Sequence, residues 1–320
     1  MPQVSFADRV AIVTGAGGGL GRTYALEIAR RGGAVVVNDL GGSVAGEGRS
    51  TAMADKVVEE IRAAGGRAVA SYDSVSTTEG AQAIVQTALN GFGRVDALIN
   101  NAGTLRNAWF EDFSLEDRDA MFDVHLAGAF NVTQAAWPHL KRQRYGRVVF
   151  TSSGAGMLGN PTQSAYGAAK AAVVGLMHVL ALEGAEYGVL CNALMPNAAG
   201  RMATQMDPDI IGANMPFIER LSYGFDPEFV TGVAVYLASE ACQTGHAIYS
   251  ALAGRISRTF IGVTHGWQGP QGAPPDADAI AEHIEQIRDP LRGFDIPDNL
   301  IDEYRLLAMQ APPQYVATGC

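Results

Sequence analysis

Residues 10–21, VAIVTGAGGGLG, and the ten residues after them, RTYALEIARR, decide the fold of this chain. The stretch passes from a short apolar run into a glycine-rich turn, and apolar residues at helical spacing follow. Glycines let the backbone turn sharply, and the unpaired N–H groups at a helix N-terminus bind anions such as a pyrophosphate. The stretch therefore predicts a strand, a dinucleotide-binding turn and a helix; a plain tight turn is the alternative.

Short, nearly all-apolar runs alternate with longer helical stretches along most of the chain. Such runs are typical of parallel strands buried on both faces. The alternation predicts an α/β fold, a Rossmann-type doubly wound parallel sheet. The expected strands are Val10–Thr14, Ala34–Asn38, Arg67–Ser71, Ala97–Asn100, Arg147–Thr151, Val189–Leu194 and Ala247–Ala251. The expected helices are Leu20–Arg31, Thr51–Ala64, Glu79–Gly91, Leu115–Arg144 and Ala165–Tyr187.

We expect a single domain of residues 1–265 and a C-terminal extension of residues 266–320 packed on it. The extension begins with a loop-like stretch, QGPQGAPP, and then holds helix-like segments at residues 278–288 and 300–309. About 55 residues with few strand signals are too few for a large separate core. Within the domain, residues 196–226 break the alternation, and a long irregular insertion after a strand usually covers a site. We therefore expect a substrate lid there.

Composition excludes several classes of protein. The chain has 320 residues and a net charge of −10, so it offers no broad positive surface to nucleic acid or anionic membrane. No stretch approaches the roughly 18 uncharged apolar residues of a membrane span, and the first ten residues lack a secretion signal. We expect a cytoplasmic protein. Cys191, Cys242 and Cys320 are too few and too widely spaced for a disulfide framework or a thiolate metal site.

Asp39 directly follows the second expected strand and lies 18 residues beyond Gly21. A carboxylate that binds the ribose of a dinucleotide is expected about 20 residues after such a turn. This carboxylate would repel a 2′-phosphate, and no arginine directly follows it, so the sequence favours NAD over NADP. A solvated acid at a strand end is the alternative.

Tyr166 and Lys170 lie four residues apart on an expected helix, which places them on one face about 5 to 6 Å apart at Cβ. A nearby ammonium group lowers the pKa of a phenol and makes it a usable acid or base. Ser153 follows the strand that contains Phe150, at the carboxyl edge of the expected sheet, where ligands bind. As an alternative, Ser152 and Ser153 only cap a turn.

The glycine-rich turn, the sequence NNAG at residues 100–103, Ser153 and the YxxxK pair occur in the order typical of one family. The chain resembles the classical short-chain dehydrogenase/reductase family over about residues 6–255. The phrases VVVNDLGG at residues 35–42 and ADKVVEEIR at residues 54–62 narrow the resemblance. They are similar to the (3R)-hydroxyacyl-CoA dehydrogenase module of peroxisomal multifunctional enzyme type 2 and to actinobacterial steroid-catabolic relatives.

The resemblance implies a role for each site residue. Tyr166 would be the general acid/base, Lys170 would bind the ribose and lower the tyrosine pKa, and Ser153 would hold the substrate oxygen. Asp73 would contact the adenine edge, and no metal is implied. The implied NAD site consists of Gly15, Gly19, Leu20, Gly21, Asp39, Asp73, Ser74, Asn100, Ala102, Gly103, Tyr166, Lys170, Asn197, Ala198 and Ala199.

Two positions depart from the pattern of the broad family. His125 replaces the Asn that supports a water relay beside the lysine, and the multifunctional subgroup resembles this chain in having His there. A catalytic role for His125 in organising water and a structural role both stay open. Asn197 replaces the usual Gly after Pro196. The contacts of residues 197–199 with the carboxamide group of the nicotinamide therefore stay open.

The resemblance implies hydride transfer between NAD and a secondary alcohol or ketone, with (3R)-3-hydroxyacyl-CoA and 3-oxoacyl-CoA as the pair, on a fatty-acyl or steroid thioester. One alternative is a 17β-hydroxysteroid dehydrogenase that acts on the free steroid. Another is a catalytically idle NAD-binding sensor, which would not need Ser153, Tyr166 and Lys170.

The expected lid and its surroundings carry weaker signals for the lipid or acyl-CoA substrate. Met202, Met206 and Met215 suit a large apolar ligand, or else fill a core. Four arginines are candidates for contacts with CoA phosphates, or else face solvent: Arg201, Arg220, Arg255 and Arg258. The apolar helix at residues 165–182 suits a partner subunit, as in the homodimers and homotetramers of the family.

Overall fold

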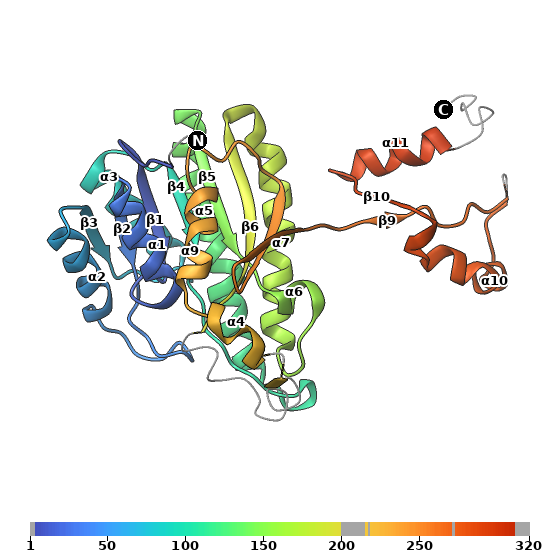
Figure 1. The fold of residues 1–320 in the computed structure, drawn as a ribbon, viewed down its shortest axis with the longest axis horizontal. Helices are drawn as coiled ribbons and strands as arrows, with labels where there is room; N and C mark the ends of the chain where they lie inside the picture. Colours follow the sequence, from blue (N-terminus) through green and yellow to red (C-terminus); the bar gives the residue numbers. More distant parts are fainter. Residues whose placement is uncertain (1–3, 200–214, 217, 271–272, 311–320) are drawn as a thin grey trace. The chain divides into compact units, whose positions relative to one another are not determined.

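The computed structural model describes residues 4–199, 215–216, 218–270 and 273–310. Its eight-stranded sheet has the order β3-β2-β1-β4-β5-β6-β7-β8 (Figure 1), and the pairs from β3 to β7 are all parallel. The strands are β1 (Val10–Thr14), β2 (Ala34–Asn38), β3 (Arg67–Ser71), β4 (Ala97–Asn100), β5 (Gly146–Thr151), β6 (Val189–Asn197), β7 (Ala247–Leu252) and β8 (Arg255–Thr259). The predicted Rossmann-type α/β fold is confirmed.

Helices cover both faces of the sheet, as the all-apolar strands predict. Tyr24 and Ile28 belong to the core on one face, and Leu140 and Met177 belong to the core on the other. The first face is covered by α1 (Gly19–Arg30), α2 (Ala52–Ala63) and α9 (Glu228–Leu237). The second is covered by α3 (Thr78–Phe92), α5 (Gly128–Gln143) and α7 (Ser164–Gly184).

A π-helical turn interrupts the single helix expected at Leu115–Arg144. The chain forms α4 (Leu115–Phe122), then the π-turn η2 (Asp123–Ala127), and then α5. Such turns frequently occur at functional sites. The turn contains His125, whose side chain is buried.

The strand β8 was not expected from the sequence. Ala253 and Gly254 both have positive φ, of 49° and 82°, and form the two-residue turn between β7 and β8. A turn with two positive φ angles matches the twist of a hairpin. Ala253 is not a residue that predicts such a turn, so this hairpin could not be expected from the residue types.

By length and composition alone, the helical stretch Ser164–Tyr187 would be long and apolar enough to cross a membrane. It consists of α7 and the short turn η3 (Ala185–Tyr187). In the structure α7 packs against β5 and β6, and its Lys170 is buried. We therefore assign it to the helical cover of the sheet.

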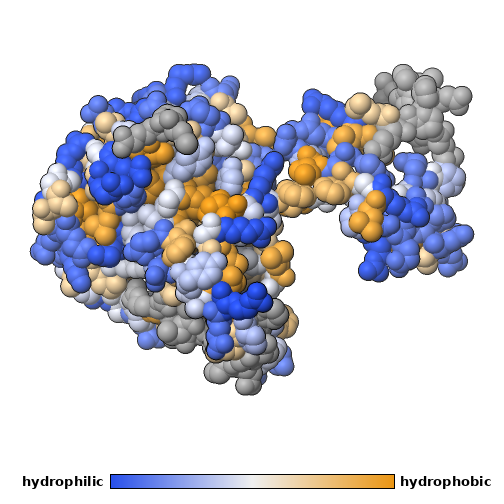
Figure 2. Space-filling view, viewed as in Figure 1, coloured by the Kyte–Doolittle hydropathy of each residue, from blue (hydrophilic) through white to orange (hydrophobic). Residues whose placement is uncertain are grey.

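The chain divides into two compact units, Met1–Arg258 and Thr259–Cys320. The second unit contains the antiparallel pair β9 (Val263–Thr264) and β10 (Phe294–Asp295). Its helices are α10 (Ala277–Arg288) and α11 (Leu300–Gln310), close to the helices expected there. Apolar side chains are visible on its surface in Figure 2. Leu291 of this unit is 95% exposed. The boundary expected at residue 265 and the packing of the extension stay predictions.

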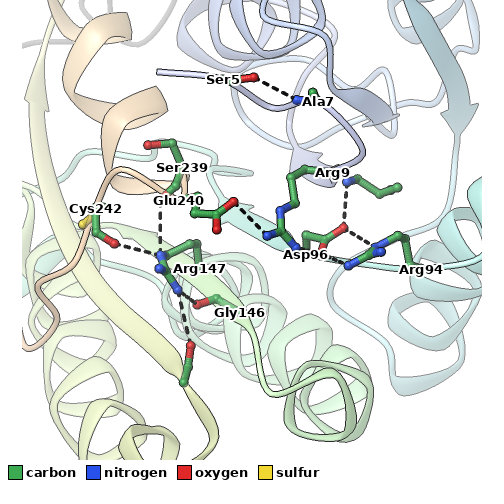
Figure 3. A network of polar contacts seen from close by, with 12 residues as sticks. Ser5, Ala7, Arg9, Arg94, Asp96, Gly146, Arg147, Ser239, Glu240 and Cys242 are labelled. Atoms are coloured by element: carbon green, nitrogen blue, oxygen red, sulfur yellow. Dashed lines mark hydrogen bonds and ion pairs between the residues drawn. The ribbon is translucent and has the colours of Figure 1, made fainter. Parts of the chain in front are cut away.

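A network of charged side chains joins the amino ends of β1, β4 and β5 (Figure 3). Asp96 is fully buried and accepts hydrogen bonds from the guanidinium groups of Arg9 (3.1 Å) and Arg94 (2.7 and 2.8 Å). It also accepts one from the backbone N–H of Val10 (2.9 Å). Arg9 in turn pairs with the exposed Glu240 at 2.8 Å.

Arg147 lies in the same network and is also buried. Two guanidinium groups contact the ring of Tyr145, that of Arg9 at 3.8 Å and that of Arg147 at 4.6 Å from its centroid. The Arg147 guanidinium donates to the backbone carbonyls of Gly146, Gly188, Ser239 and Cys242. The network is at the opposite edge of the sheet from the predicted site.

Candidate active site

The glycine-rich turn joins the carboxyl end of β1 to α1 and has the geometry of an anion cradle. A Cβ on Gly21 would lie 2.3 Å from the carbonyl oxygen of Gly15, so only glycine lets α1 start so close to the turn. Gly19 has φ of +51°, and a Cβ there would meet no atom within 4 Å. The N-cap residue Gly18 has no side-chain hydrogen bond to the first turn of α1. The free N–H groups and the open space fit a pyrophosphate.

Asn101 fastens this turn, although it was not among the residues predicted for the site. Its side-chain amide donates to the carbonyl oxygens of Thr14 (2.9 Å) and Gly15 (3.1 Å). The Thr14 hydroxyl accepts from the N–H groups of Asn101 and Ala102, both at 3.0 Å. The NNAG sequence was the available signal, but it does not tell which of its two asparagines binds the turn.

Asn100 has a supporting role in the structure. It is buried, and its amide donates to the hydroxyl of Thr133 at 2.9 Å, which ties the end of β4 to α5. The structure thus divides the two asparagines between the helix cover and the glycine-rich turn.

Asp39 lies beside the glycine-rich turn at the end of β2. One carboxylate oxygen accepts from the N–H of Gly17 at 2.8 Å, and the other accepts from the N–H of Gly41 at 2.7 Å. At the end of β3, Asp73 accepts from the Ser71 hydroxyl at 3.2 Å. The structure therefore places both acids on the carboxyl edge, on the β2–β3 side of the turn.

Ser153, Tyr166 and Lys170 come together beyond the carboxyl end of β5. The Lys170 amine lies 5.7 Å from the centroid of the Tyr166 ring and donates to the carbonyl oxygen of Thr151 at 2.6 Å. The Ser153 side chain is hydrogen bonded to Tyr166. Ser153 is also the N-cap of α6 (Gly154–Leu158), where it accepts from the N–H of Ala155 at 3.1 Å. The Ser153 side chain therefore caps the turn and also contacts Tyr166, so the two alternatives do not exclude each other.

Burial dominates the protonation chemistry of this trio. It lowers the pKa of Lys170 to about 7. It also raises the pKa of Tyr166, which the hydrogen bond from Ser153 lowers only in part. The sequence predicted instead that the ammonium lowers the tyrosine pKa. The structure differs because desolvation of the phenolate is the larger effect.

His125 contacts this trio through the π-turn. Its ring packs by an edge on Tyr166, with centroids 5.1 Å apart and planes at 86°. Nε2 lies 2.7 Å from the carbonyl oxygen of Thr104 and 3.3 Å from the Thr104 backbone N. The shorter contact favours the tautomer with the proton on Nε2. Burial and the charge of Lys170 hold the pKa of His125 well below its usual value, so the ring is neutral.

A small cavity lies between His125 and Lys170. Its volume is about 10 Å³, and Asn100 and Thr151 also line it. Within the described part of the chain, His125 Nδ1 and Thr151 Oγ1 are buried without a hydrogen-bond partner. A space of this size with polar walls suits one water molecule.

A family model described as "short chain dehydrogenase" matches residues 9–211. The chain belongs to the short-chain dehydrogenase family. It is therefore an oxidoreductase of a family that binds a nicotinamide dinucleotide. The site geometry agrees with that assignment, because an anion cradle and a tyrosine–lysine pair share one edge of the sheet.

This short-chain dehydrogenase is similar to several known proteins. It is 47% identical, over 90% of its length and 96% of the relative, to a short-chain type dehydrogenase/reductase of Mycobacterium tuberculosis. It is 43% identical to mouse peroxisomal multifunctional enzyme type 2, over 89% of this chain but only 37% of that enzyme. A solved 7α-hydroxysteroid dehydrogenase, complexed with NADH and 7-oxo glycochenodeoxycholic acid, aligns with a TM-score of 0.69 and 25% identity over 78% of this chain and 95% of its own. The resemblances to the family, to the multifunctional enzyme and to an actinobacterial relative are confirmed.

The structure of this short-chain dehydrogenase leaves part of the expected substrate side undescribed. Ala199 donates to the carbonyl of Phe225 at 2.6 Å, and this bond ties the segment after β6 to the segment before α9. Asn197 is exposed at the end of β6. Most of the expected lid lies outside the described residues, including Arg201, Met202 and Met206. Four other candidates are exposed: Met215, Arg220, Arg255 and Arg258.

Proposed function

We propose that the protein oxidises a (3R)-3-hydroxyacyl-CoA to the 3-oxoacyl-CoA with NAD, on a fatty-acyl or steroid thioester. The observation that carries the proposal is the convergence of Ser153, Tyr166 and Lys170 beside the anion cradle. The substrate class is supported by the similarity to the mouse multifunctional enzyme over nearly all of this chain.

In this proposal Ser153 holds the substrate oxygen and Tyr166 moves the proton. The Tyr166 phenolate takes the hydroxyl proton in oxidation, and the phenol returns it in reduction. Lys170 has a pKa of about 7 and lies beside the Tyr166 ring, so its amine can take up or release a proton near neutral pH. A bound nicotinamide would supply the hydride acceptor or donor for the carbinol carbon.

We further propose that His125 orders one water molecule beside Lys170. With its proton on Nε2, the ring offers only the lone pair of Nδ1 to the cavity of about 10 Å³. Such a water would accept from Lys170 and donate to His125, and so would connect the amine to a fixed acceptor. These observations favour the water-organising role over a purely structural one.

NAD is the proposed cofactor because of Asp39. Its carboxylate lies at the end of β2 and is held by the N–H groups of Gly17 and Gly41. A 2′-phosphate beside it would bring two negative groups together.

The proposal is tested with purified protein, NAD and (3R)-3-hydroxyacyl-CoA, by following NADH formation. The Tyr166→Phe variant should lose roughly a thousandfold in turnover, because the acid/base group is removed, while NADH binding is retained. A smaller loss of about tenfold is expected for His125→Phe. Tyr236→Phe on α9 is the matched control and should keep its turnover. Unchanged turnover in Tyr166→Phe would exclude its proposed role.

The cofactor choice is tested in the same assay. NAD should be used in preference to NADP, and Asp39→Ala should narrow that preference by tenfold or more, since like-charge contacts cost several kcal/mol. Equal use of both cofactors by the parent protein would refute the NAD assignment.

A second candidate function is oxidation of a free 17β-hydroxysteroid. It is favoured by the structural likeness to a hydroxysteroid dehydrogenase solved with a bile-acid ligand. A higher kcat/KM for the free steroid than for the CoA thioester would replace the first proposal. If neither is oxidised while NAD binds, the protein is an NAD-binding sensor.

A further inference from the structure

Residues 41–50, which follow Asp39, form a loop that we call the strap. The N–H of Ser50 donates to the carbonyl of Leu40 at 3.1 Å and closes the ends of the loop. Gly41 has φ of +75°, and a Cβ there would lie 1.9 Å from the Ser50 carbonyl oxygen, so only glycine fits this base. Gly46 and Gly48 also have positive φ, of 87° and 80°. Such glycines are suited to hinges.

The strap is latched to the segment after β4. The N–H of Leu105 donates to the carbonyl of Val44 at 3.1 Å. The Arg106 guanidinium donates two hydrogen bonds to the carbonyl of Ala45, at 3.1 and 2.9 Å, and a third to the carboxylate of Asp117 on α4, at 2.5 Å. The charge-assisted bond to Asp117 fixes the position of the guanidinium group. Its two hydrogen bonds to the Ala45 carbonyl then hold the strap in place.

The sheet order shows what this connection crosses. The strap leaves the end of β2, and residues 104–106 follow β4, while β1 lies between those two strands. A bridge from β2 to β4 at the carboxyl edge must pass the end of β1, where the glycine-rich turn and the N-terminus of α1 lie. In Figure 1 the blue segment after β2 runs along the same edge of the sheet as α4.

We propose that the strap closes over the bound dinucleotide and that Arg106 is the positioning residue that holds it closed. Arg106 therefore controls the release of the cofactor. The inference rests on the proposed NAD site. It adds a control of cofactor release, which is separate from the proton transfer at Tyr166. Most strap residues are exposed, so few buried contacts other than the latch oppose opening.

The first test compares Arg106→Gln with Arg118→Gln. Arg118 lies on α4 and pairs with Asp119 at the surface. Arg118→Gln removes the same charge as Arg106→Gln but no contact to the strap, so it serves as the control. We expect NADH to dissociate about tenfold faster from Arg106→Gln in a stopped-flow displacement experiment, because charge-assisted bonds to the strap are lost. Arg106→Lys should rescue only part of the effect, since an ammonium lacks the planar fork. Arg118→Gln should release NADH at the parent rate.

Hydrogen exchange gives a readout independent of the cofactor. Backbone amides of residues 41–50 should exchange faster in Arg106→Gln than in the parent when no NADH is added, while the amides of β1 keep their protection. A Val44→Cys and Leu105→Cys double variant then tests the opposite direction. Its oxidised form should release NADH at least tenfold more slowly than its reduced form, because a covalent latch keeps the strap closed.

Two outcomes separate this inference from the proposed function. If the parent binds no NADH, the proposed function fails. If the parent binds NADH but neither Arg106→Gln nor the oxidised double variant changes its release, the strap inference is overturned and the NAD site stands.

Discussion

Lys170 shows how the fold changes the chemistry of one residue. Its amine is buried, donates to the Thr151 carbonyl, and has a pKa lowered to about 7 from 10.5. In the unfolded chain the same amine holds its proton up to the usual value. The folded protein is therefore the form that releases this proton first as the pH rises.

This difference predicts a pH-dependent stability. Below pH 7 the amine is protonated in both states, so the cost of burying its charge is constant. From about pH 7 to 10.5 the unfolded chain holds a proton that the folded chain lacks, and the free energy of unfolding rises with pH. For one proton the slope approaches 1.4 kcal/mol per pH unit. Urea unfolding from pH 6.5 to 9.5 measures the free energy of unfolding of the parent and of Lys170→Met. The value for the parent should rise relative to that of the variant by about 1 kcal/mol per pH unit. Parallel curves would contradict the prediction.

The sequence predicted which residues meet but not how they are protonated. Ser153, Tyr166 and Lys170 could be found because a strand end and an i, i+4 helical spacing place them together. The neutral state of His125 depends on burial and on the charge of Lys170, and its contact with the Thr104 carbonyl comes from a different loop. A sequence pattern does not contain that contact.

At the scale of elements, most strands of the sheet were predictable because they are nearly all apolar. The π-turn at residues 123–127 was not, since the apolar spacing of the two flanking helices reads as one continuous helix. Likewise β8 has exposed residues on much of its length, and such an edge strand leaves little apolar pattern.

The charged network of Figure 3 links the amino ends of β1, β4 and β5 and includes no residue of the candidate site. Asp96→Asn leaves two guanidinium groups without their buried carboxylate, so we expect the free energy of unfolding to fall by about 3 kcal/mol. Glu240→Gln is the control, because Glu240 is 63% exposed and should contribute less than about 1 kcal/mol. Chemical denaturation at pH 7 measures both. An Asp96→Asn variant as stable as the control would show that the network does not hold β1 and β4 together.

At the scale of the whole molecule, α5 and α7 present apolar side chains to the surface. Phe130 is 46% exposed, and Val179 and Leu182 on α7 are 53% and 52% exposed. Exposed apolar patches of this kind mark contacts with other chains. They support the expectation of a homodimer or homotetramer, which stays a prediction, as does the cytoplasmic location.

Light scattering after gel filtration tests the assembly. The parent should have a mass that is a multiple of 33.7 kDa. The double variant Val179→Arg and Leu182→Arg should shift toward the single-chain mass, because charges would be buried in the contact. Glu59→Arg on α2, which covers the other face of the sheet, should keep the parent mass. A monomeric parent would refute the expectation.

The charged network and the site occupy opposite rims of one sheet. Substitutions at the amino rim would change how much folded enzyme a cell accumulates, since lost stability lowers abundance. Substitutions at the carboxyl rim would instead change what each surviving molecule does. Protein level and specific activity can therefore be selected separately in this scaffold.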